Sequence, residues 1–392
     1  MLKILADENI PFAQEAFGTL GEVQVLPGRA IKSEVLRDVE VLLVRSITAV
    51  NAGLLRGTAV RFLGTATIGI DHIDLNYLQA HNIAFASAVG SNANSVAEYV
   101  TAALLHWAVS CRIDLPGKIL GVVGAGHVGS LVIQKARALG LQVLVDDPPL
   151  ARKIRSERSV PPWDFCSLDE LMPADMVTVH TPLLHDGSDP TFHLFDETRL
   201  RAMKRGSILI NTARGAVVDN QALKKVLQAQ HLSGAILDVW EHEPCPDLEL
   251  LRRVNVATPH IAGYSFDGKL QGTLQIYVAL CRFLGVPPTW DATSCLPAPA
   301  QPVIESDRRH DRAAEVLHGI VRQAYNLAAD DQALRDGLYR SDWGDEHRGR
   351  HFDDLRRSYP PRREFGNYRV QLHQSQLHLG ASLLELGFQI YA

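Results

Sequence analysis

A glycine-rich segment near the middle of the chain most constrains how this sequence can fold. Residues 124–129 read G-A-G-H-V-G, which has the G-x-G-x-x-G spacing of a dinucleotide-binding loop. The spacing alone is weakly diagnostic, because glycines often coincide by chance. Here, however, the segment follows the apolar stretch Ile119–Val123 and leads into the helical stretch Ser130–Leu139. The sequence therefore predicts a strand, a tight turn and a helix that together bind the phosphates of a dinucleotide.

Each glycine of this segment has a predicted task. Gly124 would make the tight turn, Gly126 would let the backbone approach a pyrophosphate, and Gly129 would let the helix pack closely on the strand. The free N–H groups at the start of the helix would face the phosphates. His127 and Val128 lie between these glycines, so we expect them at the cofactor as well.

Two acidic residues follow the next predicted strand, in the sequence V-D-D-P. An acid at this position accepts hydrogen bonds from the ribose hydroxyls and repels a 2′-phosphate, which favours NAD over NADP. We expect Asp147 to take this role because Pro148 follows it at the loop, and Asp146 is the alternative. Arg152 and Lys153 lie slightly further on and would suit a 2′-phosphate, so they count against NAD.

Short apolar stretches alternate with helical patterns along most of the chain, which is typical of parallel α/β sheets. A break at Leu115-Pro116-Gly117 separates two such runs. A long helix is predicted before the break, with Ser95 as its N-cap and Glu98 as the capping-box partner. We expect an α/β protein with two Rossmann-like, doubly wound parallel-sheet lobes and a small C-terminal α/β domain. The predicted strands are Lys3–Ala6, Val23–Leu26, Val41–Val44, Arg61–Thr65, Ile119–Val123, Gln142–Val145, Met176–His180, Ser207–Asn211, Gly234–Asp238 and Val254–Ala257.

Composition argues against several other classes of protein. The 392 residues are too many for one compact core, and a net charge of −5 offers no basic excess for binding nucleic acid. The five cysteines include no C-x-x-C pair, so we expect neither disulfides nor a metal site, and thiols in a reducing cytoplasm. We find neither a signal peptide nor a run of about 20 apolar residues, so we expect no membrane partner.

Three polar segments directly follow strands of the second run: N-T-A-R-G, D-V-W-E-H-E-P and T-P-H-I-A-G. The carboxyl ends of parallel strands meet at one edge of a sheet, so we expect these segments to converge. Oxidation of an alcohol by hydride transfer needs a base for the hydroxyl proton, which suits His260. Glu243 would orient that histidine, and Arg214 would grip a substrate carboxylate through its forked guanidinium. Taken singly, each of the three would more often be a structural residue.

In combination these segments resemble those of the D-isomer-specific 2-hydroxyacid dehydrogenases, and the resemblance covers about residues 1–285. It implies NAD-dependent oxidation of a 2-hydroxyacid, with Arg214, Glu243 and His260 as the catalytic residues. It also implies a set of residues at NAD in addition to the glycine loop. These are Asp147, Thr181, Thr212, Ala213, Arg214, Asp238 and Gly263.

The same resemblance implies how the chain is divided. Residues 1–94 and 265–290 would form a substrate-binding lobe, and residues 95–264 an NAD-binding lobe inserted into it. Residues 291–392 would form a C-terminal domain through which two chains make a homodimer. We expect the protein in the cytoplasm.

Similarity to one branch of the family extends over nearly the whole chain and implies a phosphorylated hydroxyacid as substrate, contacted by Ser46, Thr67 and Tyr264. We add Arg45 because a cation suits a phosphate, although a structural ion pair is at least as good an interpretation. Two alternatives stay open. The chain could be another enzyme of the family, acting on 3-phosphoglycerate or glycerate, or a non-catalytic NAD-sensing protein such as a transcriptional corepressor.

Overall fold

The computed structural model describes residues 1–391, which form two compact units. Unit 1 consists of Met1–Asn92 and Tyr264–Ala298, and unit 2 consists of Ala93–Gly263 and Pro299–Ala392. The chain therefore passes from unit 1 into unit 2, returns, and enters unit 2 a second time. No helix within residues 1–391 is both long and apolar enough to cross a membrane.

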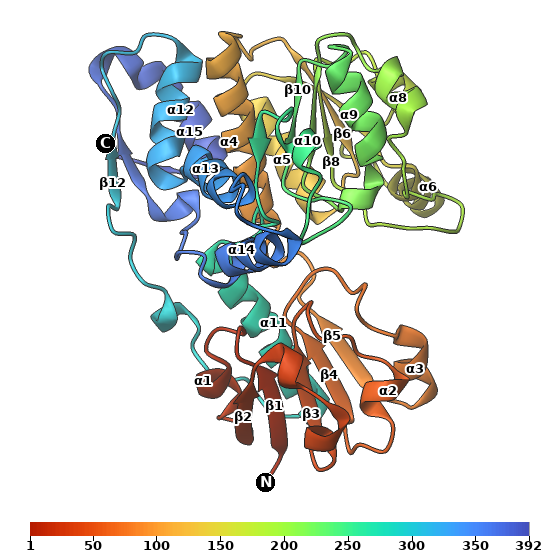
Figure 1. Ribbon diagram of the computed structural model, residues 1–392. Helices are drawn as coiled ribbons and strands as arrows, with labels where there is room; N and C mark the ends of the chain where they lie inside the picture. Colours follow the sequence, from red (N-terminus) through yellow and green to blue (C-terminus); the bar gives the residue numbers. More distant parts are fainter. Residues whose placement is uncertain (392) are drawn as a thin grey trace. The chain divides into compact units, whose positions relative to one another are not determined.

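Unit 1 is built on a five-stranded parallel sheet (Figure 1). Its elements are β1 (Lys3–Asp7), α1 (Ala13–Phe17), β2 (Glu22–Leu26), η1 (Gly28–Ala30), η2 (Ser33–Leu36), β3 (Val41–Val44), α2 (Ala52–Leu55), β4 (Phe62–Thr65), α3 (Leu75–Ala80), β5 (Ala84–Ser87), α11 (Phe266–Leu284) and η4 (Thr293–Cys295). The strand order is β2-β1-β3-β4-β5. Ile4 and Leu43 pack with α1 and α11, whereas Leu5 and Leu42 pack with η2, α2 and α3. Both faces of the sheet are thus covered, which explains why its strands are apolar throughout.

Unit 2 contains a six-stranded parallel sheet. Its strands are β6 (Ile119–Val123), β7 (Gln142–Asp146), β8 (Met176–Val179), β9 (Ile208–Asn211), β10 (Gly234–Leu237) and β11 (Val256–Ala257). They lie in the order β7-β6-β8-β9-β10-β11, so the chain moves from β6 to one side and then returns to continue on the other side. This reversal at β6 and β8 is where open parallel sheets place their ligands.

Helices cover both faces of this second sheet. They are α4 (Ala93–Cys111), α5 (His127–Ala138), α6 (Pro148–Glu157), α7 (Leu168–Leu171), α8 (Glu197–Ala202), η3 (Gly215–Val217), α9 (Asn220–Gln228) and α10 (Leu248–Leu251). Val122 and Ile210 point to the face that α4 and α5 cover. Leu209 and Leu237 point to the opposite face, which α9 and α10 cover. Successive side chains of a strand point to opposite faces of the sheet, so each apolar strand contributes residues to the core on either side.

The C-terminal residues of unit 2 add a small parallel sheet and four helices. These elements are β12 (Val303–Glu305), α12 (Ala313–Ala324), α13 (Leu327–Leu338), α14 (Asp345–Arg357), η5 (Phe365–Asn367), β13 (Arg369–Gln371), η6 (Gln374–Leu379), α15 (Gly380–Leu386) and β14 (Gln389–Ile390). Helix α12 packs on α4, and α15 packs on α5 (Figure 1). Apolar residues of both tail helices, such as Ile320 and Leu383, are buried in the same core as those of α4 and α5.

The structure confirms the predicted α/β fold class with two parallel sheets and a small C-terminal α/β region. The predicted strands are present, with ends that differ by a residue or two, but the sequence pattern did not indicate β5 or the three strands of the C-terminal sheet. The predicted N-cap at Ser95 is wrong, because α4 begins at Ala93 and Ser95 lies inside it. Ser95 Oγ instead donates to Glu364 Oε1 at 2.8 Å, and Glu98 Oε1 accepts from the Phe365 N–H at 2.8 Å. The local pattern resembled a capping box because both residues are polar, but their partners come from the far end of the chain.

Candidate active site

The residues expected at the cofactor lie along one edge of the unit 2 sheet. Because all six strands are parallel, their carboxyl ends share this edge. The glycine loop follows β6, Thr181 follows β8, Thr212 follows β9, and Asp238 follows β10. His260 lies just beyond β11. The structure therefore brings five separate segments to the edge where such sheets bind ligands.

The glycine loop has the geometry that the spacing predicts. Gly124 has a φ of +89°, and a Cβ there would lie 2.9 Å from the backbone carbonyl carbon of His180. A Cβ on Gly129 would lie 1.9 Å from the carbonyl oxygen of Gly124, so only glycine allows this helix to approach its strand. By contrast, a Cβ on Gly126 would meet no atom within 4 Å. Helix α5 begins at the next residue, and the free N–H groups of its first turn are those that the proposed pyrophosphate contact requires.

Both acids after β7 have defined surroundings. Asp147 Oδ2 accepts a hydrogen bond from the Ala125 N–H at 2.8 Å, and Oδ1 accepts from the Leu150 N–H at 2.9 Å. Asp147 therefore holds the glycine loop and caps α6 at the same time. Asp146 is buried, and this burial together with the neighbouring Asp147 raises its pKa from 3.8 to about 6. Asp147, the more exposed of the two, stays our prediction for the ribose.

Two polar residues after β8 lie beside the glycine loop. His180 is half-buried, and the loss of hydration lowers its pKa to about 3 and keeps its ring neutral. Its Nε2 lies 3.0 Å from the Thr178 hydroxyl, and its Nδ1 lies 3.3 Å from the Thr212 hydroxyl. The adjacent Thr181 Oγ1 is buried and has no hydrogen-bond partner among residues 1–391. An unpaired buried hydroxyl at a cofactor edge fits a group that hydrogen-bonds to NAD.

A carboxylate and a histidine come together at the end of the sheet. His260 Nδ1 lies 2.8 Å from Glu243 Oε2. The second oxygen, Oε1, accepts from the Trp240 N–H at 3.0 Å, so the carboxylate cannot turn freely. Burial acts to raise the pKa of Glu243, but His260 and the Trp240 N–H outweigh it and the pKa is lowered. With Nδ1 engaged and the ring 34% exposed, Nε2 is the nitrogen left to take a proton from a substrate.

Asp238 lies beneath the loop that carries this histidine. It is 1% exposed, and its carboxylate accepts from the Thr258 hydroxyl at 2.6 Å, the Ile261 N–H at 2.8 Å and the Ala262 N–H at 3.0 Å. Its carbonyl also accepts from the His260 N–H at 2.7 Å. His260 has a φ of +57°, a left-handed conformation that costs about 1–2 kcal/mol for a residue with a side chain. These bonds hold the loop in that conformation, and a contact of Asp238 with NAD stays a prediction.

Arg214 is the N-cap residue of the short helix η3 and lies three residues after the end of β9. Its Nη1 donates to the Ala213 carbonyl at 2.8 Å. Asn211 fixes the same turn: its Nδ2 donates to the Arg214 carbonyl at 2.9 Å, and its Oδ1 accepts from the Ala213 N–H at 3.0 Å. The N-T-A-R-G segment thus begins with the residue that shapes the turn. We did not single out Asn211 from the sequence, although its place in the motif could have indicated it.

The residues expected at the substrate all lie in unit 1, where Tyr264 begins the returning segment. Ser46 is exposed, and Thr67 Oγ1 donates to the Gly69 carbonyl at 3.0 Å. Arg45 Nη1 donates to the Asn9 carbonyl at 2.9 Å, and its guanidinium lies 6.0 Å from the Tyr264 ring. The partners of Arg45 are thus a carbonyl and an aromatic ring. Their roles in substrate binding stay predictions.

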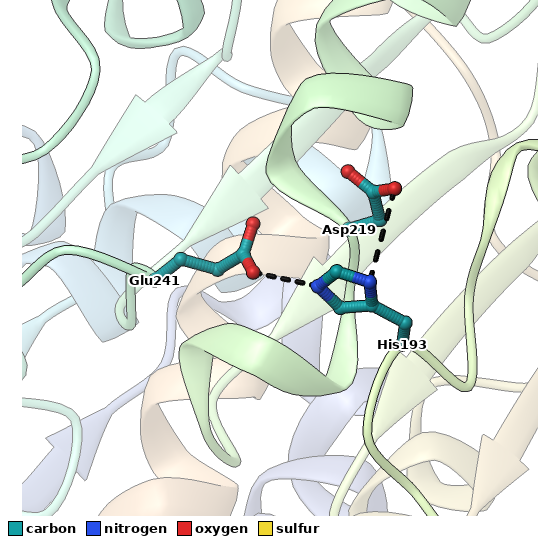
Figure 2. Close-up of side chains that lie close together, drawn as sticks. All are labelled: His193, Asp219 and Glu241. Carbon is teal, nitrogen blue, oxygen red and sulfur yellow. Dashed lines mark hydrogen bonds and ion pairs between the residues drawn. The ribbon is translucent and has the colours of Figure 1, made fainter.

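A histidine and two carboxylates meet on a neighbouring set of loops in unit 2 (Figure 2). His193 Nε2 lies 2.7 Å from Glu241 Oε1, and its Nδ1 lies 3.9 Å from Asp219 Oδ2. Among the described residues this is the group close enough to hold a metal ion. The two ring nitrogens, however, face different carboxylates, so the histidine lies between the two acids and links separate loops. The 2.7 Å contact joins the loop after β8 to the segment just before Glu243, and no local sequence signal could reveal it.

Comparison with known proteins agrees with this geometry. Residues 88–262 match the family described as "D-isomer specific 2-hydroxyacid dehydrogenase, NAD binding domain", so unit 2 contains an NAD-binding domain. Residues 295–387 match a "Domain of unknown function (DUF3410)". A D-lactate dehydrogenase from Aquifex aeolicus, solved with NAD and lactic acid, is 26% identical with a TM-score of 0.58. The match covers 72% of this chain and 96% of that one.

Two curated relatives are similar over nearly their whole length. The erythronate-4-phosphate dehydrogenase of Cellvibrio japonicus is 44% identical over 99% of this chain and 100% of its own. The erythronate-4-phosphate dehydrogenase of Azotobacter vinelandii is 47% identical over 95% of each chain. The chain therefore belongs to the erythronate-4-phosphate dehydrogenase family, within the D-isomer-specific 2-hydroxyacid dehydrogenases.

Proposed function

We propose that this chain oxidises the C2 hydroxyl of 4-phospho-D-erythronate to 2-oxo-3-hydroxy-4-phosphobutanoate with NAD, in the biosynthesis of pyridoxal 5′-phosphate (vitamin B6). The observation that carries the chemistry is the Glu243–His260 pair, held at 2.8 Å on the sheet edge that also bears the glycine loop. The choice of substrate is supported by the 44–47% identity to erythronate-4-phosphate dehydrogenases along the entire chain.

Each catalytic residue has one task in this proposal. Arg214 holds the C1 carboxylate and the C2 oxygen through its forked guanidinium. His260 Nε2 takes the proton of the C2 hydroxyl, and Glu243 stabilises the imidazolium that forms. Bound NAD supplies the acceptor for the hydride that leaves C2. The C–H and O–H bonds of the substrate break, a C2=O double bond forms, and the released proton remains on His260.

The residues proposed to hold NAD follow from the same edge. The first turn of α5, with the glycine loop, His127 and Val128, binds the pyrophosphate. Asp147 accepts the ribose hydroxyls, which supports NAD over NADP. The remaining proposed contacts come from Thr181, Thr212, Ala213, Arg214, Asp238 and Gly263. On the substrate, Ser46, Thr67, Tyr264 and Arg45 are the proposed binding residues.

NADH formation by the purified protein tests this function. NAD is mixed with 4-phospho-D-erythronate, 3-phosphoglycerate or D-glycerate, with a parallel reaction containing a 2-oxoacid that reoxidises any retained NADH. We expect turnover with the four-carbon phosphate and little with the other two acids. Turnover with 3-phosphoglycerate or glycerate instead would keep the chemistry and overturn the substrate. No NADH formation with any of the three acids would favour an NAD-sensing binding protein.

We also propose that the protein is a cytoplasmic homodimer formed through its C-terminal residues. The tail exposes several large apolar side chains, of which Leu377 at 60%, Leu384 at 58% and Tyr391 at 55% are the most exposed. Large apolar side chains that one chain leaves exposed are typical of a surface that a partner covers. Analytical ultracentrifugation of wild type and Leu384→Glu measures their oligomeric states. A wild-type dimer that becomes a monomer in Leu384→Glu supports the proposal, and a wild-type monomer contradicts it.

A further inference from the structure

A buried segment of the C-terminal tail contacts the parts of unit 2 that flank the catalytic histidine. Arg362 is 7% exposed, and its Nη2 donates to the Ala262 carbonyl at 2.8 Å and the Ser95 carbonyl at 3.3 Å. Its guanidinium carbon lies 4.1 Å from the centre of the Tyr325 ring. One tail side chain thus bridges the start of α4 and the loop two residues after His260.

The next residues of the tail strengthen this bridge. Glu364 accepts from Asn94 Nδ2 at 2.6 Å and from the Ser95 hydroxyl at 2.8 Å. The Phe365 N–H donates to Glu98 Oε1 at 2.8 Å. The first turns of α4 are therefore held by charged and backbone groups that come from a distant part of the sequence. Such partners are costly to bury unless they are paired, so their pairing here fixes the position of the segment.

The bridged residues stand next to the points where the chain passes between units. Helix α4 begins at Ala93, where the chain enters unit 2, and Ala262 precedes Gly263, the last residue before the chain leaves it. Ala262 is held from two sides, because its N–H donates to Asp238 Oδ2 while its carbonyl accepts from Arg362. Loss of either partner would release one side of the loop that keeps His260 at a φ of +57°.

A second part of the tail contacts the other catalytic loop. Cys245 Sγ lies 3.4 Å from the Asp345 carbonyl, and a Cβ on Gly349 would lie 3.2 Å from Pro244 Cγ and from Cys245 Sγ. Helix α14 therefore packs directly on the residues after Glu243. Tail residues therefore contact both loops of the catalytic pair: Arg362 contacts the loop of His260, and α14 contacts the loop of Glu243.

We propose that Arg362 is a positioning residue for His260, through which the C-terminal tail holds the catalytic loop of its own chain in the conformation needed for proton transfer. The proposal rests on the proposed function, since it takes His260 as the base. Both carbonyls accept from the same nitrogen, Nη2, so a lysine ammonium can replace part of this bonding, but it lacks the planar guanidinium that lies on the Tyr325 ring. A displacement of about 1 Å in a catalytic group lowers rates by about 100-fold, which sets the expected scale.

The test compares Arg362→Met and Arg362→Lys with a matched control, Arg335→Met. Arg335 is also a tail arginine that holds two backbone carbonyls, those of Leu251 at 2.7 Å and Val254 at 3.1 Å, but neither lies in a catalytic loop. We expect Arg362→Met to lower kcat about 10- to 100-fold while the Kd for NAD changes less than about twofold, with partial rescue in Arg362→Lys. Arg335→Met should lower the melting temperature without a comparable loss of kcat.

Hydrogen–deuterium exchange of the peptide around residues 258–264 gives a readout that does not depend on turnover. We expect faster exchange there in Arg362→Met and unchanged exchange in Arg335→Met. If wild type turns over no hydroxyacid, the proposed function fails while the exchange still decides whether Arg362 holds the loop. Normal kcat together with normal exchange in Arg362→Met would overturn the positioning role, as would equal losses of kcat in the two methionine variants.

Discussion

Replacing Asp238 by asparagine tests whether this residue holds the catalytic loop in place or contacts NAD directly. The wild-type carboxylate accepts from the Thr258 hydroxyl and from the N–H groups of Ile261 and Ala262. Asparagine keeps one oxygen but turns an NH₂ group toward the Ala262 N–H, so one bond is lost and two become neutral. A bond to a charged acceptor contributes about 1.5–3 kcal/mol and a neutral bond about 1 kcal/mol. We therefore expect Asp238→Asn to lower the free energy of unfolding by about 2.5–7 kcal/mol.

Urea denaturation, kcat and NAD affinity measured on the same preparations test this prediction. Asp196→Asn is the control, because Asp196 also accepts a backbone N–H, that of Arg199 at 2.9 Å, but caps α8. Asparagine is a good N-cap, so the control should lose less than about 1 kcal/mol. Asp238→Asn should lose stability and kcat together. If instead it lost NAD affinity with an unfolding free energy equal to the wild type, Asp238 would be a cofactor contact and no anchor.

Three further substitutions test other parts of the site. His260→Ala should lower kcat about 100- to 10,000-fold with an unchanged Kd for NAD, and near-normal turnover would refute its role as the base. Thr181→Val removes a buried hydroxyl that has no hydrogen-bond partner among residues 1–391. The affinity for NAD should therefore fall about 5- to 10-fold, while the stability of the protein without NAD should not fall. NAD binding equal to that of wild type would show that Thr181 does not contact the cofactor. Burial and Asp147 raise the pKa of Asp146 from 3.8 to about 6, so the folded state favours its protonated form and this contribution is lost as the pH rises through about 6. Asp146→Asn should therefore be more stable than wild type by about 2–3 kcal/mol at pH 8 and equal to it at pH 4, whereas a difference independent of pH would contradict the raised pKa.

Much of the fold and the cofactor loop could be predicted because their signals are local. The glycine spacing depends on contacts between neighbours, such as Gly129 against the carbonyl of Gly124. The apolar strands are continuous because helices cover both faces of each sheet. The order of the polar segments after strands placed Glu243 and His260 at one edge, and their 2.8 Å contact follows from the parallel sheet.

The rest depends on residues far apart in the sequence. Ser95 and Glu98 resembled a cap, but Ser95 pairs with Glu364, 269 positions away, and Glu98 with Phe365, 267 positions away. The pairing of His193 with Glu241 spans 48 positions and has no motif of its own. Periodicity and spacing report only the near neighbours of a residue, so such long-range contacts were beyond the reach of the sequence pattern.

The most direct test of the central claim follows the hydrogen from C2 of the substrate. The enzyme is mixed with NAD and 4-phospho-D-erythronate that carries deuterium at C2, and the mass of the NADH formed is measured by mass spectrometry. The proposed reaction transfers the C2 hydrogen as a hydride, so the NADH should carry one deuterium, and His260→Ala should form it far more slowly. Reduced nucleotide without deuterium, or none at all, would contradict oxidation at C2 by this site.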